Sequence, residues 1–214
     1  MSQDISYFKH YRKEMLPFIP TTATKILEVG CGQANFSSQL VKEGNEIWGI
    51  ELNPNAAQVA SEKLYKVLTG TVEERISEIP DNYFDVIIMN DVIEHLIYPK
   101  EILEQLKTKM VVNGLIVSSI PNVRYSKNLF KLLFKKDWKY TESGILDNTH
   151  FRFFTKKSIK RMFTETGFEV EKCKGINRTE SFLYFPFAIL FNIILLFSQV
   201  DIFFMQFATV ARKK

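Results

Sequence analysis

Residues 25–37, KILEVGCGQANFS, join a short apolar run to a turn that contains two glycines. Lys25–Val29 is rich in β-forming residues, Gly30 and Gly32 follow it closely, and helical spacing of apolar residues begins after them. In a doubly wound α/β sheet, the backbone approaches a nucleotide-like ligand at such a strand–glycine–helix unit. The dinucleotide fingerprint would require glycine at position 35, where Asn35 stands, so the sequence disfavours hydride-transfer chemistry.

The same alternation continues along the chain. Further β-rich runs occur at Glu46–Glu51, Lys66–Thr69, Phe84–Asn90, Leu115–Ile120 and Glu169–Ile176. Helical spacing occupies Asn35–Glu43, Pro54–Lys63, Lys100–Lys109 and Lys156–Thr166. Strands that alternate with helices predict a parallel sheet covered on both faces. The last run, Phe203–Ala211, follows the sixth strand without an ordinary crossover helix, so we expect it to pair antiparallel to that strand.

Length and composition limit the class of protein further. A chain of 214 residues suits one domain, 1–214, and its formal net charge of +4 does not predict a nucleic-acid partner. Cys31 and Cys173 form no CxxC pair, which favours a reducing compartment. Charged residues occupy the N-terminus where a signal peptide needs an apolar run, so we expect a cytoplasmic protein.

Two acidic residues lie near the carboxyl ends of the first two expected strands. Glu28 lies two positions ahead of Gly30, and Glu51 ends the second strand, 21 residues after that glycine. A carboxylate at the end of the second strand can accept hydrogen bonds from both ribose hydroxyls of a bound nucleotide. The pattern therefore predicts a ligand that contains a nucleoside.

Residues 26–34, ILEVGCGQA, resemble the first motif of the class I S-adenosylmethionine-dependent methyltransferases, [ED]xGxGxG, with Ala34 at the third glycine. The resemblance extends roughly from Tyr7 to Lys213. It implies an α/β fold, a doubly wound Rossmann-like sheet of seven strands with the last strand antiparallel and an apolar insertion between strands 6 and 7. It also implies S-adenosyl-L-methionine as the cofactor.

The resemblance assigns cofactor-binding roles to several turns at one sheet edge. TGTVEE follows the third strand, where the family contacts adenine, and FDVIIMNDVIEHL resembles the fourth-strand motif beside the sulfonium. In the first motif the glycine turn would pass under the methionine part, Glu28 would organise the turn, and Glu51 would hold the ribose. The cofactor-binding residues implied are Glu28, Gly30, Cys31, Gly32, Glu51, Leu52, Thr71, Val72, Glu73, Asn90 and Asp91.

Methyl transfer to a hydroxyl requires alignment and removal of a proton. His95 lies four residues after Asp91, so a helical turn would bring the two side chains to one face, and Asp91 would orient the imidazole as a general base. Alternatively, Glu94 and His95 form a capping or packing pair. A metal ion on Asp91, Glu94 and His95 would have three ligands crowded into five residues, so we expect no metal.

A second distinctive stretch is GILDNTHFRFFT, residues 144–155, which together with IPNVRY resembles methyltransferases of bacterial polysaccharide and glycolipid biosynthesis. The resemblance places Asn122, Asp147 and Arg152 on the acceptor side and makes His150 an alternative base. Arg152 would anchor an anionic or hydroxyl-rich acceptor. The plainer interpretation is a salt bridge between Asp147 and Arg152 that fixes the loop. We expect residues 121–150 to form an acceptor-side insertion, and residues 1–24 a lid or cover.

Two further segments are unusually apolar. Residues 127–139, KNLFKLLFKKDWK, carry five lysines and one aspartate among large apolar residues, a composition typical of segments that bind anionic membranes. Residues 181–200 contain no charged residue, and eight of the 19 phenylalanines lie between Phe182 and Phe207. A span across a bilayer would separate the last strand from its sheet, so we expect the apolar insertion 177–202 to hold short in-plane or buried helices.

These features predict an enzyme that methylates oxygen, most simply a sugar hydroxyl on a glycan or a lipid-linked precursor. Methylation of a lipophilic small molecule such as a quinone-type phenol is the main enzymatic alternative. A non-catalytic, cofactor-binding membrane adaptor is the alternative from another class. Residues 127–139 and 181–200 would form a basic, apolar surface for a membrane, although a homodimer interface or a closed acceptor pocket would suit the same residues.

Overall fold

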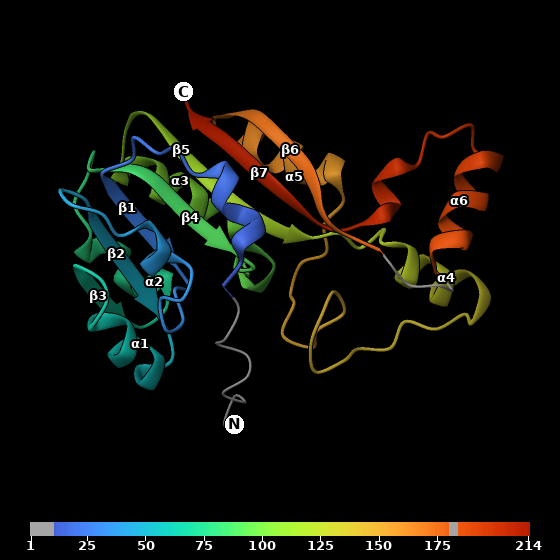
Figure 1. Ribbon diagram of the computed structural model, residues 1–214, viewed down its shortest axis with the longest axis horizontal. Helices are drawn as coiled ribbons and strands as arrows, with labels where there is room; N and C mark the ends of the chain where they lie inside the picture. The colour runs from blue at the N-terminus through green and yellow to red at the C-terminus, as the bar shows by residue number, and fades with distance from the viewer. Residues whose placement is uncertain (1–10, 180–183) are drawn as a thin grey trace.

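The computed structural model describes residues 11–179 and 184–214. Its centre is a seven-stranded sheet in the order β3-β2-β1-β4-β5-β7-β6 (Figure 1). The strands are β1 (Lys25–Val29), β2 (Glu46–Glu51), β3 (Lys66–Thr69), β4 (Phe84–Asn90), β5 (Met110–Pro121), β6 (Phe168–Arg178) and β7 (Phe204–Lys213). Strands β1 to β5 pair in parallel, and β7 pairs antiparallel with both β5 and β6. The doubly wound sheet with an antiparallel last strand is therefore confirmed.

Two buried clusters cover the two faces of the sheet. The α-helices are α1 (Pro54–Ser61), α2 (Val72–Arg75), α3 (Pro99–Lys109), α4 (Ser126–Phe134), α5 (Lys156–Glu165) and α6 (Tyr184–Ile194). Short 3-10 helices are η2 (Lys13–Phe18), η3 (Ser37–Leu40), η4 (Ile76–Glu78), η5 (Ile93–His95) and η6 (Val200–Phe203). Buried residues of α3 and α5 pack on one face, and those of η2 and α1 pack on the other. In β1, Ile26 belongs to one cluster and Leu27 and Val29 to the other, so this strand buries apolar side chains on both faces of the sheet.

The boundaries of β1 to β4 match the sequence, whereas β5 begins at Met110, five residues before the expected Leu115, and one expected helix is not an α-helix. The helix expected at Asn35–Glu43 is only the 3-10 helix η3, because the chain turns back at once. The Asn45 side chain accepts a hydrogen bond from Lys42 N at 3.1 Å and donates one to Leu40 O at 2.7 Å. This turn leads directly into β2.

Helix α5 begins at the residue expected from the sequence. The Thr155 hydroxyl accepts from Ser158 N, and the Ser158 side chain accepts from Thr155 N, which completes a capping box. Gly167 follows the helix with φ of 82°, a left-handed conformation that glycine adopts without strain.

Helices α4 and α6 lie side by side beyond the end of β5, at the right of Figure 1. The Phe130 and Phe187 rings join them, with centroids 5.4 Å apart. We call residues 126–139 and 184–203 the α4–α6 lobe. Within the described residues, no helix is long and apolar enough to cross a membrane.

Candidate active site

The glycine turn after β1 lies at the carboxyl edge of the sheet, where its backbone is left-handed. Gly30 and Gly32 have φ of 71° and 54°. A Cβ atom at Gly30 would lie 2.7 Å from Cγ2 of Val92, so no larger residue fits without displacing its neighbour. The amides of Gly30 and Cys31 donate to Ile50 O at 2.8 and 3.1 Å, which ties the turn to β2.

Glu51 joins the glycine turn to the segment that follows β2. Its Oε2 accepts from Gly32 N at 2.7 Å, and its Oε1 accepts from Asn53 N at 2.8 Å. Each carboxylate oxygen can accept a second hydrogen bond, so the ribose role expected of Glu51 is compatible with these contacts. Leu52, the next residue, is 67% exposed and offers apolar surface at the same edge.

Several polar atoms at this edge are buried without a hydrogen-bond partner among the described residues. They are Oε2 of Glu28 and both amide atoms of Asn90. Burial raises the pKa of Glu28 to about 8. Buried polar atoms cost free energy unless they are hydrogen-bonded, so an edge with such atoms suits a polar ligand. Together with the Glu51 carboxylate, these side chains suit the amino and ribose groups of S-adenosylmethionine, and their roles toward the cofactor remain predictions.

The turn after β3 offers few free side chains for a contact with adenine. Thr71 caps α2, accepting from Glu74 N at 3.3 Å, and Val72 is buried in the core. Glu73 alone of the three residues expected to contact adenine has an exposed side chain. Any contact from Thr71 or Val72 to a nucleoside would use main-chain groups.

Asp91 does not orient His95, contrary to the expected Asp91–His95 pair. Its carboxylate forms an ion pair with Arg12 and accepts from Ser119 Oγ at 3.1 Å and from Gln206 Nε2 at 2.6 Å. The reason is that Ile93–His95 forms a single 3-10 turn, so the four-residue spacing does not place the two side chains on one helical face. Arg12, from the segment expected to form a lid, thus reaches the end of β4. Tyr7 and Phe8 lie outside the described residues.

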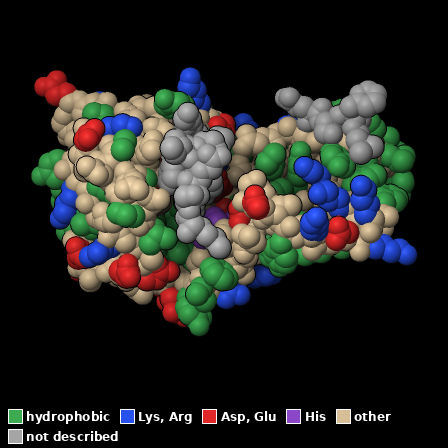
Figure 2. Space-filling view, turned by 90° about the horizontal axis from the view of Figure 1, so that it is seen from below, with side chains coloured by type: hydrophobic (Ala, Val, Ile, Leu, Met, Phe, Trp, Pro, Cys, Tyr) green, Lys and Arg blue, Asp and Glu red, His purple; other side chains and the backbone are tan. Residues whose placement is uncertain are grey.

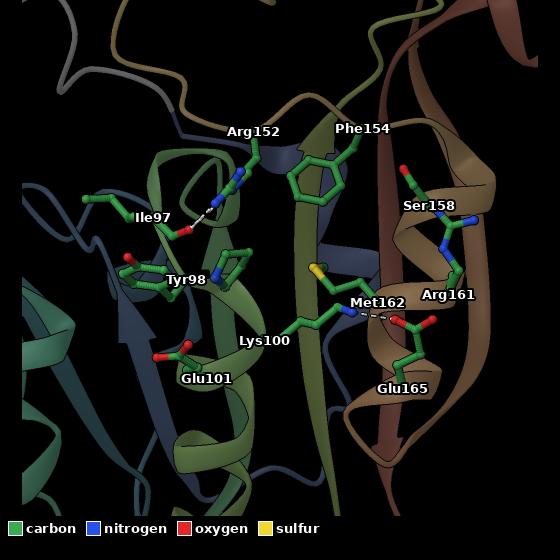
Figure 3. Close-up of a pocket in the computed structure, with 11 residues that line it drawn as sticks. Ile97, Tyr98, Lys100, Glu101, Arg152, Phe154, Ser158, Arg161, Met162 and Glu165 are labelled. Atoms are coloured by element: carbon green, nitrogen blue, oxygen red, sulfur yellow. Dashed lines mark hydrogen bonds and ion pairs between the residues drawn. The ribbon is translucent and has the colours of Figure 1, made fainter.

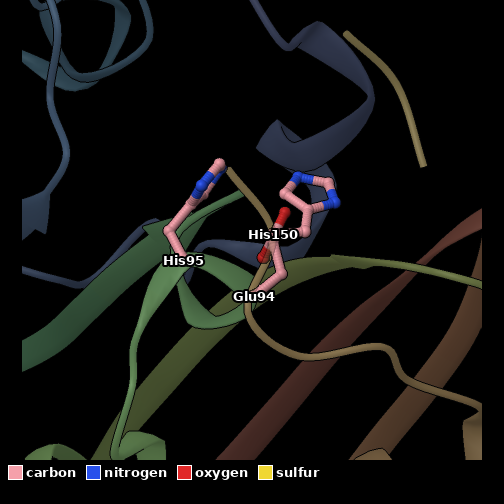
Figure 4. Close-up of side chains that lie close together, drawn as sticks. All are labelled: Glu94, His95 and His150. Atoms are coloured by element: carbon pink, nitrogen blue, oxygen red, sulfur yellow. The ribbon is translucent and has the colours of Figure 1, made fainter. Parts of the chain in front are cut away.

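His95 and His150 meet instead, with ring centroids 4.6 Å apart at an interplanar angle of 75° (Figure 4). Nδ1 of His95 lies 3.2 Å from Thr149 O, and Nδ1 of His150 lies 3.0 Å from Ile145 O. A carbonyl accepts only from a protonated nitrogen, so these contacts favour the tautomers in which Nε2 is free to accept a proton. Burial, followed by the neighbouring His150, lowers the pKa of His95 below 6.5.

Asp147 supports this histidine pair through Thr149. Its Oδ1 accepts from Thr149 N at 2.8 Å and from Thr149 Oγ1 at 2.6 Å, while the same hydroxyl lies 3.2 Å from Nδ1 of His95. Asp147 also raises the pKa of His95, although less than burial lowers it. The carboxylate that acts on His95 therefore comes from the second distinctive stretch rather than from β4.

Glu94 lies beside both rings and is 1% exposed. Within the part of the chain that the structure describes, neither carboxylate oxygen has a hydrogen-bond partner, and burial raises the pKa of the group to about 8. One donor atom each from Glu94, His95 and His150 lies within 4.8 Å of the others. This differs from the Asp91, Glu94 and His95 set considered from the sequence, because the loop after α4 supplies the third donor. The expectation of no metal remains a prediction.

The other residues expected on the acceptor side lie elsewhere. Asn122 is fully buried and donates to Asp201 O and Phe204 O, both at 2.9 Å. Arg152 donates to Ile97 O at 2.7 Å, and its nearest partner is therefore a carbonyl rather than Asp147. It lines a pocket of about 360 Å³ between the starts of α3 and α5, with Tyr98 and Arg161 (Figure 3).

The sheet order, the glycine turn and the acidic residue that ends β2 define the class: this is the fold of S-adenosylmethionine-dependent methyltransferases. Solved structures of that class align with nearly the whole chain. A methyltransferase from Archaeoglobus fulgidus has a TM-score of 0.68 at 20% identity and covers 94% of this chain and 90% of its own. One from Listeria monocytogenes has a TM-score of 0.63 at 14% identity, covering 94% and 96%.

The chain belongs to the methyltransferase family whose model is described as "Methyltransferase domain", which matches residues 2–172. S-adenosylmethionine as the cofactor is confirmed at the level of this family. Among curated proteins, the ubiquinone biosynthesis O-methyltransferase of Rickettsia canadensis is 28% identical over 160 residues, 71% of this chain and 65% of that protein. The protein of the same name from Aeromonas salmonicida is 26% identical over 163 residues, 72% and 66%. The matched region thus spans about two thirds of these relatives.

Two contributors to the site carried no signal in the sequence, and a third carried a weak one. Ser119 and Gln206 bind Asp91 from β5 and β7, and neither belongs to a motif. Thr149 lies inside the stretch that also contains Asp147 and His150, so its place between an acid and a base was the one available hint.

Proposed function

We propose that the chain transfers the methyl group of S-adenosylmethionine to a hydroxyl oxygen of a lipophilic, phenol-type small molecule. The observation that carries the proposal is the His95–His150 pair at the carboxyl edge, with both Nδ1 atoms next to carbonyl oxygens. The names of the curated relatives favour a quinone-type acceptor over a sugar. The sugar hydroxyl of a glycan or lipid-linked precursor is the second acceptor to be tested.

Different residues of the carboxyl edge would bind the cofactor and remove the proton. Glu51, the Gly30–Gly32 turn and Asn90 would hold the cofactor, which supplies an electrophilic methyl carbon when bound. Nε2 of His95 would accept the proton of the acceptor hydroxyl as its oxygen attacks, and its lowered pKa keeps the imidazole neutral and able to do so at pH 7. Asp147 and Thr149 would keep the ring in place during transfer.

A labelling experiment tests this proposal. The purified protein is incubated with methyl-labelled S-adenosylmethionine and a cell extract separated into lipid, glycan, protein and RNA pools. We expect label in the lipid pool, in an alkali-stable methyl ether. Label in the glycan pool, or in a methylated sugar that acid hydrolysis releases from the lipid pool, would support the sugar acceptor, and label in neither pool would contradict both. EDTA in a parallel reaction shows whether a metal ion on Glu94, His95 and His150 takes part.

We place this activity in the cytoplasm, at the surface of a membrane that holds the acceptor. The free thiols of Cys31 and Cys173 support a reducing compartment. Fractionation of the native protein between cytosol and membranes, with and without 1 M salt, measures this distribution. A protein recovered only outside the cytoplasm would contradict it.

A further inference from the structure

The α4–α6 lobe exposes large apolar side chains that a soluble domain usually buries. More than half of the exposed large apolar residues in the described part of the chain lie in it. The most exposed include Phe134, Leu190, Ile193, Ile194, Leu196 and Phe197, between 51% and 87% exposed. Contiguous exposed apolar surface marks a site of interaction with a membrane or another protein. All of α6 lies beyond residues 2–172, the part of the chain that matches the family model.

The tip of the lobe is a defined turn. Leu196 and Phe197 have φ of 50° and 56°, a left-handed conformation that costs a residue with a side chain roughly 1–2 kcal/mol. Asn192, which is fully buried, holds the turn: its backbone oxygen accepts from Phe197 N at 2.6 Å, and its side chain donates to Gln199 O at 3.2 Å. Two large apolar residues are thus held outward at a strained position.

Lysines accompany this apolar surface. Lys135, Lys136 and Lys139 are exposed after α4, and residues 127–139 contain five lysines against Asp137 alone. Figure 2 shows basic side chains beside apolar ones at the right-hand end of the molecule, which is the lobe in Figure 1. The combination of apolar side chains and a basic margin matches an anionic bilayer, where each lysine near the surface contributes about 1 kcal/mol.

The α4–α6 lobe is fixed to the carboxyl edge of the sheet. Arg124 forms an ion pair with Asp201, Nε to Oδ2 at 2.7 Å, and Asn122 donates to Asp201 O. These contacts join the loop after β5 to the segment before β7. A membrane on the lobe would therefore lie near the carboxyl end of β5.

We propose that the α4–α6 lobe binds the surface of an anionic lipid bilayer, with Leu196 and Phe197 inserted among the headgroups and the lysines against lipid phosphates. A second copy of the chain fits less well, because a twofold contact through the lobe would bring lysines near the partner's lysines. No described helix is long enough to cross, so the lobe lies in the interface plane. The binding requires neither cofactor nor acceptor, and the proposal goes beyond the methyl transfer.

Vesicle flotation tests the proposal without any substrate. The full chain is mixed with vesicles of phosphatidylcholine alone or with 30% phosphatidylglycerol. We expect flotation with the anionic vesicles, at least about tenfold weaker binding for L196N/F197N, and a similar loss for K135E/K139E or in 0.5 M salt. Asparagine tolerates a left-handed backbone, so the first variant retains the fold. V41N/V112N and K172E/K174E, which alter exposed residues elsewhere, are the matched controls.

Three results would overturn the proposal. The intact protein could fail to float with anionic vesicles, or L196N/F197N could float as well as the unaltered chain. Light scattering without lipid could also show a dimer that L196N/F197N converts to monomers, which would assign the surface to self-association. Equal binding to neutral and anionic vesicles would contradict the role of the lysines.

Discussion

The carboxyl edge of β1–β4 and the α4–α6 lobe both leave side chains in an unfavourable environment, but the two environments are opposite. At the edge, polar atoms of Glu28, Asn90 and Glu94 are buried with no hydrogen-bond partner in residues 11–179 and 184–214. In the lobe, apolar residues such as Leu196 are exposed to water. Each arrangement costs free energy in the isolated chain, so each indicates a missing partner of matching chemistry. The edge therefore suits a polar ligand, and the lobe is the surface that we propose binds lipid.

The largest effect is expected at the histidine pair. Replacing His95 or His150 by alanine should lower kcat by about 10²- to 10⁴-fold, because the acceptor loses the imidazole that takes its proton. The acid limb of the pH–rate profile should lie below pH 6.5, because the pKa of His95 is lowered. Steady-state kinetics measure both, and S-adenosylhomocysteine affinity is the control. Full turnover in both variants would show that neither imidazole is the general base, and no turnover in the unaltered chain with every acceptor pool would favour the non-catalytic adaptor.

Glu94 should make the protein less stable as the pH rises. Its pKa is raised to about 8 in the folded chain, so the folded state binds a proton that the unfolded state releases above about 4.5. The free energy of unfolding should therefore fall between pH 5.5 and 8, and E94Q should remove up to about 3 kcal/mol of that fall. Urea denaturation at both values measures it. E73Q, at an exposed position, is the control, and parallel profiles for E94Q and the unaltered chain would contradict the expectation.

Glu51 should affect cofactor affinity without affecting the lobe. E51A removes the acceptor for Gly32 N and the expected ribose contacts, and we expect affinity for S-adenosylhomocysteine to fall about 10- to 100-fold. Calorimetry measures this change, with E62A as the exposed control. An unchanged affinity would show that the ribose assignment is wrong, whereas altered vesicle binding would show that the two regions are coupled.

The smallest effect is expected inside the lobe. N192A removes hydrogen bonds to Ala188 O and Gln199 O and should destabilise the turn by about 1–2 kcal/mol. Hydrogen exchange should accelerate in α6 and η6, with cofactor affinity unchanged. S198A, on the exposed side of the same turn, is the comparison. Faster exchange throughout β1–β4 would mean that the lobe contributes to the stability of the whole sheet.

Much of the fold could be predicted because its signals are local. Apolar runs delimit β1 to β4 to the residue, and Thr155 and Gly167 bound α5 through their own conformational preferences. The helix expected after the glycine turn was the exception. There, the Asn45 side chain forms hydrogen bonds with the backbone of Leu40 and Lys42 and turns the chain. The spacing of apolar residues does not reveal such competing hydrogen bonds.

The candidate site divides in the same way. The glycine turn and the end of β2 follow from the sequence, because a strand end and a left-handed backbone depend on nearby residues. The partners of the side chains do not. Asp91 binds Arg12 rather than His95. His95 meets a histidine 55 residues away, and this contact exists only once the end of β4 and the loop after α4 are brought together.

The sequence by itself determined the sheet, the cofactor edge and the two unusually apolar segments, because each of them depends on residue type and spacing. Only the tertiary structure decided which imidazole faces which, and that α4 and α6 form one lobe beside the reaction edge. The physical reason is that spacing specifies local backbone and the side of an element that is buried. The pairing of distant side chains is set by the packing of whole elements against one another.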